Sequence, residues 1–279
     1  MQPVNPTNPL QKYYRQPKLF VSLPSKGVYY PEGSLQGDYS NVPIFGMSGM
    51  DEILYKTPDA LFSGEATIKV VESCCPYIKD AANMPTLDVD TLVIAIRVAT
   101  FGEKITYSHK CPNCNAENDF EVDLRTILEY FTTLNYDNKV EVGDLTVTLR
   151  PLTYKELTQI NIENFKLQKM LVQLDLIGDE EQKQIKVDEI YKKLAELQTE
   201  LFITSIESVQ IPEGVVNQKE FIAEWVKNSE RELYAKIKEK LELNKAAWEV
   251  PKQKVQCPEC GTPDEIEINL DQSSFFAKA

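Results

Sequence analysis

The sequence has very little histidine, with His109 as the single example among 279 residues. Because Ser-His and Cys-His mechanisms need a histidine base beside the nucleophile, this scarcity removes most of them. The chain has no Gly-rich phosphate loop, and Gly46-Met47-Ser48-Gly49-Met50 lacks the strand-to-helix context of a nucleophile elbow. Acidic pairs are frequent, and in so acidic a chain we interpret them as solvated surface. We therefore expect a protein that is not an enzyme.

Long apolar runs are also missing. No stretch reaches the ~18 to 20 residues that a bilayer span needs, which excludes the membrane-spanning class. The first residues, MQPVNP, have neither the basic start nor the apolar run of a signal peptide. We expect a protein that stays in a reducing cytosol, where free thiols persist.

The six cysteines include two copies of one short motif, Cys111-Pro-Asn-Cys114 and Cys257-Pro-Glu-Cys260. Paired C-x-x-C knuckles of this kind are typical of a four-thiolate zinc site, so we predict that these four residues hold one structural Zn²⁺. With every ligand position taken by a thiolate, such a site has no open position for water or substrate.

The resemblance between the two copies continues beyond the cysteines. Alternating apolar and polar residues begin at the same offset in each copy, over 119–124 and 265–270, and predict a strand after each knuckle. Asn115 and Gly261 follow the second cysteines, and both residue types accept the left-handed conformation of a tight turn. The matched pattern disfavours two alternatives, namely unrelated reduced cysteine pairs and redox-active dithiols.

The remaining candidates for ligands are less suited to the site. His109 is an alternative ligand only if one cysteine fails, and otherwise we interpret it as a solvated strand residue. Cys74 and Cys75 fall on a helical pattern and are expected to be core thiols, because adjacent cysteines rarely pair with each other.

The net charge of the chain indicates which classes of molecule it can bind. The net charge is −13 and the isoelectric point is about 4.7, whereas nucleic-acid binding needs a basic surface that neutralises phosphates. Neither knuckle has a basic or aromatic face. We therefore expect no nucleic acid and no membrane as partner, and instead proteins with basic or apolar contact surfaces.

We predict an α+β fold, mainly helical, with a small antiparallel sheet clipped by the four-cysteine zinc ribbon and with a helical-hairpin insertion. The expected segments are an extended Pro/Tyr-rich arm (1–45), an α+β core with the first knuckle (46–138), a hairpin plus helical insertion (139–250), and the second knuckle with a strand and C-terminal tail (251–279). The arm has apolar anchors, so we expect it to dock on its own domain or on a neighbouring subunit. Its removal (1–43) is expected to weaken partner binding more than thermal stability.

Helix signals precede and follow the first knuckle. Ser48 and Ser63 are expected to cap two helices, a third runs from Thr86 to Thr100, and a short one runs from Arg125 to Thr132. This predicts three helices before the first knuckle.

The region between the knuckles begins with a predicted hairpin over 140–150, around Gly143-Asp144. Thr153 with Glu156 forms a capping box for a long helix, and a second long helix follows a turn near Gly178-Asp179. Leucine-rich heptad seams predict that these helices pair as an antiparallel hairpin. Two further helices are expected to begin at Asn217 and Ser229.

Several stretches together resemble a known family. They are residues 20–27 (FVSLPSKG), residues 46–52 (GMSGMDE), the two knuckles, and the ending 269–276 (NLDQSSFF). The chain is similar to the T-even-type baseplate hub assembly proteins of contractile-tailed phages, and residues 149–157 resemble the start of phage tail assembly chaperones. The resemblance implies a late, non-enzymatic viral protein that binds other baseplate hub proteins, with the tape-measure protein as a further candidate. It would act in the host cytoplasm as a chaperone or remain in the virion.

Two rival functions are disfavoured. A zinc-ribbon regulator that binds nucleic acid or transcription machinery conflicts with the charge, and retention on DNA at physiological salt would support it. A metalloenzyme conflicts with a filled thiolate site.

Overall fold

The computed structural model describes residues 8–174 and 180–268. Its helices are η1 (Pro9–Tyr13, a 3-10 helix), α1 (Gly49–Tyr55), α2 (Pro58–Phe62), α3 (Glu65–Cys74), α4 (Thr86–Phe101), α5 (Leu124–Thr132), α6 (Tyr154–Gln173), α7 (Glu180–Thr204), α8 (Lys219–Asn228) and α9 (Arg231–Ala247). Its strands are β1 (Leu19–Val21), β2 (Val42–Ile44), β3 (Lys104–Lys110), β4 (Glu117–Asp123), β5 (Lys139–Val142), β6 (Leu145–Leu149), β7 (Ile206–Ile211), β8 (Gly214–Val216), β9 (Gln253–Gln256) and β10 (Pro263–Ile266).

The predicted α+β class is confirmed, but the strands form several small antiparallel sheets and not one. Three are two-stranded pairs, β1–β2, β3–β4 and β9–β10, and the fourth has the order β5-β6-β7-β8. Within the described ranges, no helix combines the length and apolarity needed to cross a bilayer.

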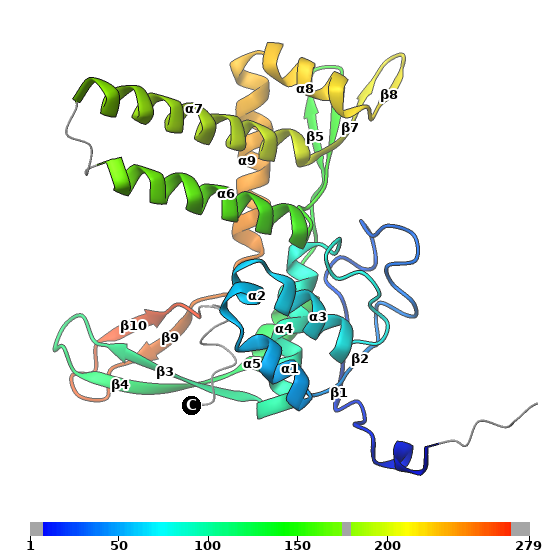
Figure 1. The fold of residues 1–279 in the computed structure, drawn as a ribbon, viewed down its shortest axis with the longest axis vertical. Helices are drawn as coiled ribbons and strands as arrows, with labels where there is room; N and C mark the ends of the chain where they lie inside the picture. Colours follow the sequence, from blue (N-terminus) through cyan, green and yellow to red (C-terminus); the bar gives the residue numbers. More distant parts are fainter. Residues whose placement is uncertain (1–7, 175–179, 269–279) are drawn as a thin grey trace, which may run out of the picture.

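The main core is built around α4, which lies among α1, α3, α5 and the β1–β2 pair (Figure 1). Ile94, Ala95 and Ile96 are consecutive, yet all three are fully buried. A helix that is apolar on every side must be surrounded by other elements, which explains its central position. The helix ends at Gly102, whose φ of 98° is accessible to glycine at little cost. The helix predicted over Thr86 to Thr100 is therefore confirmed.

The helices before α4 are partly as predicted. Ser48 caps α1 in a full capping box with Asp51. Ser63 is not a helix start, because it ends the short helix α2, and Gly64 in the left-handed conformation precedes α3. The prediction of three helices missed α2, which begins with Pro58 at its first turn.

The N-terminal arm packs on its own domain over the described residues. Strand β1 pairs with β2, which places Val21, Val42 and Ile44 in the main core together with Leu23. Leu23 is 1% exposed and Val42 is fully buried. This part of the arm therefore contributes to the core instead of being a loose leader.

Asp88 of α4 binds the N-terminal arm through hydrogen bonds inside the main core. This fully buried carboxylate accepts a hydrogen bond from the backbone N–H of Ser25 at 2.9 Å and from the hydroxyls of Ser25 and Tyr30. Burial raises the pKa of Asp88 to about 6, although hydrogen bonds from Ser25 and Tyr30 favour the carboxylate.

Asp88 should therefore make stability depend on pH. An unfolded aspartate titrates near pH 4, so between about pH 4 and pH 6 the folded protein holds a proton that the unfolded chain has lost. Raising the pH through this window lowers the free energy of unfolding. The asparagine of an Asp88→Asn variant cannot titrate. The free energy of unfolding of wild type minus that of the variant should therefore decrease from pH 4 to pH 6 and stay level above about pH 7. Urea titrations would measure it, and parallel curves would contradict the assignment.

A second core lies in the region between the knuckles. The predicted hairpin is confirmed as β5–β6, but β7 and β8 extend it into a four-stranded sheet that the sequence did not predict. Helices α8 and α9 cover this sheet through Ile222 and Ile237. These two helices were expected, but they begin after Gln218 and Glu230 without the predicted side-chain caps at Asn217 and Ser229.

Helices α6 and α7 form the predicted antiparallel hairpin (Figure 1). Thr153 and Glu156 form the predicted capping box at the start of α6. The seam between the helices has its own small cluster, in which Leu167, Leu174 and Ile190 are buried. The predicted turn near Gly178-Asp179 lies outside the described residues.

Candidate metal centre

The two knuckles lie at the tips of two β-hairpins, β3–β4 and β9–β10, which lie side by side (Figure 1). In the first, the backbone N–H of Cys111 donates to the carbonyl of Ala116 at 2.9 Å, and that of Asn115 donates to the carbonyl of Cys111 at 2.9 Å. Asn115 has a φ of 60°. The left-handed conformation predicted at this position is thus confirmed.

The second knuckle repeats this geometry. The backbone N–H of Cys257 donates to the carbonyl of Thr262 at 2.9 Å, and that of Gly261 donates to the carbonyl of Cys257 at 2.9 Å. Gly261 has a φ of 72°. The two turns therefore share the same backbone geometry, although they are far apart in the sequence.

The structure brings the four predicted cysteines into one cluster. The Sγ atoms of Cys111 and Cys260 are 3.7 Å apart, as are those of Cys114 and Cys257, and all four lie within 4.8 Å of one another. Metal–sulfur bonds of about 2.3 Å in a tetrahedron require sulfur–sulfur separations of about 3.8 Å. The donor set therefore fits one tetrahedral ion, with Cys111 and Cys257 buried and the other two exposed.

Polar side chains from both hairpins surround the sulfurs. The Asn113 amide donates to Cys260 Sγ at 3.6 Å and to Thr262 Oγ1 at 3.1 Å, and so crosses from one knuckle to the other. The Asn118 amide donates to Cys257 Sγ at 3.6 Å. Such hydrogen bonds stabilise thiolates and orient ligands. No sequence pattern indicates these contacts, because the partners lie more than a hundred positions away.

The sulfurs differ in their affinity for protons. Hydrogen bonds with the Thr262 side chain, the Thr262 backbone and Asn113 lower the pKa of Cys260 to about 6. For Cys114, the Ala116 backbone lowers the pKa, but loss of hydration and hydrogen bonds with the other three cysteines raise it to about 12. A metal ion must displace the protons that remain on this cluster, so metal binding should strengthen as the pH rises.

His109 joins the two hairpins beside the sulfur cluster. Its Nε2 lies 2.6 Å from Asp264 Oδ2, and both side chains are about a quarter exposed. His109 lies in strand β3 as predicted, but it is paired with Asp264 and is not simply solvated. The hydrogen bond from His109 lowers the pKa of Asp264. No sequence signal links these two residues, which are 155 positions apart.

Cys74 and Cys75 lie apart from this cluster, in the main core. Both are fully buried, which confirms that they are core thiols. Burial raises the pKa of Cys74 to about 12. Neither is suited to metal binding or nucleophilic chemistry, which require a thiolate.

Comparison with known proteins matches most of the chain to one family model. Residues 51–277 match the family model described as T4 bacteriophage base plate protein. The match covers both knuckles and the whole region between them, and it confirms the resemblance inferred from the sequence. No curated protein and no solved structure matches the chain.

Proposed function

Because this chain belongs to the family of T4 bacteriophage base plate proteins, we propose that it acts in assembly of the central hub of the phage tail baseplate. The observation that carries the proposal is the family match over residues 51–277, which includes the second core, most of the main core and the sulfur cluster. Its action is binding and not catalysis. It works in the host cytoplasm during tail assembly, as a chaperone or as a subunit that enters the virion.

For the sulfur cluster we propose structural Zn²⁺, held by Cys111, Cys114, Cys257 and Cys260. The sulfur separations of 3.7 Å support a tetrahedral site. Tetrahedral four-thiolate sites hold zinc or iron, and metal analysis with an absorption spectrum distinguishes the two, since zinc–thiolate sites are colourless. A bound ion supplies a cross-link between the hairpins, and the four thiolates leave no position for substrate.

Exposed apolar side chains near the N-terminus support a binding role. Leu10 and Tyr13 of η1 are 61% and 72% exposed, and Met50 and Ile53 of α1 are 73% and 63% exposed. Arg15, two residues after η1, connects this segment to α1, because its guanidinium donates to Asp51 at 3.1 Å. Scattered apolar residues are ordinary on a surface, but four large ones on two linked elements favour a contact with another protein. We propose that other hub proteins bind here, with the tape-measure protein as the second candidate.

The proposal is tested in infected cells. A tagged chain should co-purify with hub proteins, and quantitative mass spectrometry of finished virions then separates two roles. Absence from virions identifies an assembly chaperone, and a fixed stoichiometry identifies a hub subunit. Met50→Glu with Ile53→Glu should reduce co-purification, whereas Val215→Glu, at a residue that is 60% exposed elsewhere, should not. Recovery with neither hub proteins nor virions would overturn the proposal.

A further inference from the structure

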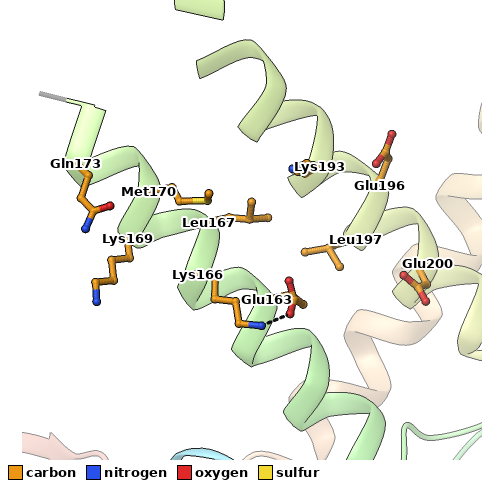
Figure 2. Close-up of a pocket in the computed structure, with 10 residues that line it drawn as sticks. All are labelled: Glu163, Lys166, Leu167, Lys169, Met170, Gln173, Lys193, Glu196, Leu197 and Glu200. Carbon is orange, nitrogen blue, oxygen red and sulfur yellow. Dashed lines mark hydrogen bonds and ion pairs between the residues drawn. The ribbon is translucent and has the colours of Figure 1, made fainter. Parts of the chain in front are cut away.

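A groove of about 630 Å³ runs between α6 and α7, and every residue that lines it belongs to these two helices. Its floor is apolar and consists of Leu167 and Met170 from α6 with Leu197 from α7 (Figure 2). Met170 is 49% exposed although it lies between two helices. The groove therefore exposes apolar surface that the hairpin does not cover by itself.

The hairpin has a small core for its length. Among the described residues, its cluster contains Leu167, Leu174 and Ile190 as buried side chains, whereas α6 has 20 residues and α7 has 25. Figure 1 shows the far ends of both helices clear of the sheets and of the main core. Most helical stability comes from packing of an apolar face, and bundles of such hairpins have four helices around that face. The hairpin has the features of half of a four-helix bundle.

The two edges of the groove have opposite charge. Lys169 lies on the outer side of α6, whereas Lys166 of the same helix extends toward Glu163 and is paired with it at 2.5 Å (Figure 2). Glu196 lies on the outer side of α7, with Glu200 further along that helix, so the lining residues of α6 have a net charge of +1 and those of α7 a net charge of −1. Lysines on one helix and glutamates on the other are complementary to a copy of the same surface turned by a half rotation. If the two-fold axis lies between the two copies and is parallel to the long axis of the hairpin, α6 of one copy lies against α7 of the other.

The remaining charges of the groove cancel. Glu163 and Lys193 also line it, so the described lining has three lysines and three glutamates, and its net charge is zero. The chain as a whole has a net charge of −13, so most faces of two copies repel each other. A neutral groove with an apolar floor is therefore a favourable place for a second copy to approach.

We propose that this groove binds the same groove of a second copy of this chain, so that two α6–α7 hairpins form an antiparallel four-helix bundle. The lysines of each α6 then face the glutamates of the partner's α7, and Met170 is covered. The inference concerns self-association, and it does not depend on the identity of the hub partners or of the metal.

The size of the surface predicts a moderate affinity. A helix of 20 residues is about 30 Å long, and two helices side by side are roughly 20 Å wide, so the face covers roughly 600 Å² in each copy. Both copies together would bury about 1,200 Å², which is the lower end of the range for specific interfaces. Dimerisation should therefore depend on concentration in the micromolar range.

Charge reversal tests the pairing directly. Lys166→Glu with Lys169→Glu makes both edges acidic, and Glu196→Lys with Glu200→Lys makes both edges basic. In sedimentation velocity, each double variant is expected to dimerise at least about tenfold more weakly than wild type, because like charges then face each other. An equimolar mixture of the two double variants should recover the dimer, since acidic edges then face basic ones. A chain with all four substitutions should also recover it.

A matched control uses lysines of α7 that are exposed and do not line the groove. Lys186→Glu with Lys192→Glu changes the charge by the same amount and should leave dimerisation within about twofold of wild type. Circular dichroism would verify that each variant keeps its helices. Wild type that stays monomeric over the whole concentration series would overturn the proposal. So would a control variant that weakens dimerisation as much as the groove variants, or a mixture of the two double variants that does not recover the dimer.

Discussion

Cys257→Ser is expected to lose the metal ion that we propose for the sulfur cluster and to separate the two knuckle hairpins. One of four ligands is replaced by a hydroxyl, a poor ligand for a thiolate-preferring ion. Structural zinc contributes about 10 to 16 kcal/mol in peptides that it alone folds. The loss here should be smaller, at several kcal/mol, because Ile266 at the end of β10 and Ile268 two residues later are buried and continue to hold this hairpin in part. Metal analysis, thermal unfolding and limited proteolysis over residues 251–268 would measure the effect.

A core thiol supplies the control for this experiment. Cys75→Ala removes a fully buried sulfur outside the cluster, so it should lower stability by about 1 to 2 kcal/mol and keep the metal. Cys111→Ser should behave like Cys257→Ser, since the first knuckle contributes the same number of ligands. Stoichiometric metal in either serine variant would show that these cysteines are not the ligands.

Removal of residues 1–43 is expected to destabilise the main core severely. The deletion takes away Val21, Leu23 and Val42, which are at most 9% exposed. Burial of such side chains contributes about 1.5 to 3 kcal/mol each, and the sum is comparable to the 5 to 15 kcal/mol stability of a whole domain. Asp88 also loses Ser25 and Tyr30, and so becomes a buried carboxyl group without these hydrogen bonds. Thermal unfolding followed by circular dichroism should show a large fall in the midpoint, or no cooperative transition.

A shorter deletion separates the core strand from the exposed start of the arm. Removal of residues 1–14 takes away η1 and keeps Arg15, whose guanidinium donates to the carbonyl of Ser73 at 2.7 Å. This variant should keep a midpoint close to that of wild type. Equal midpoints for wild type and both deletions would show that the arm does not contribute to the core, and would restore the expectation from sequence that its loss mainly weakens partner binding.

Features set by neighbouring residues were predictable. Asn115 and Gly261 were expected in the left-handed conformation because each closes a turn with a cysteine four positions earlier. Ser48 and the Thr153–Glu156 box were recognised because a cap bonds to groups within the same helical turn. The same local reasoning failed at Ser63, where the next residue, Gly64, adopts the left-handed conformation and starts the helix instead.

The cluster of four cysteines was also predictable, although its halves are distant. Two copies of a Cys-Pro-x-Cys motif with the same following pattern indicate one shared function, and a tetrahedral ion needs four ligands. Because the motif occurs twice, one shared site could be predicted without knowing where the two copies lie in space. The Asn113 and Asn118 amides have no such repetition, so their hydrogen bonds to sulfur appeared only in the structure.

The sequence by itself determined the charge of −13, the knuckle turns, the long helices and the family, because these depend on composition and on contacts between residues close in the chain. The tertiary structure decided which surfaces are buried. It placed Leu23 in the main core, added β7 to the β5–β6 hairpin, and paired His109 with Asp264. Each of these depends on the free energy of bringing distant segments together, which involves desolvation and packing of both segments. The local sequence pattern of either segment does not contain this information.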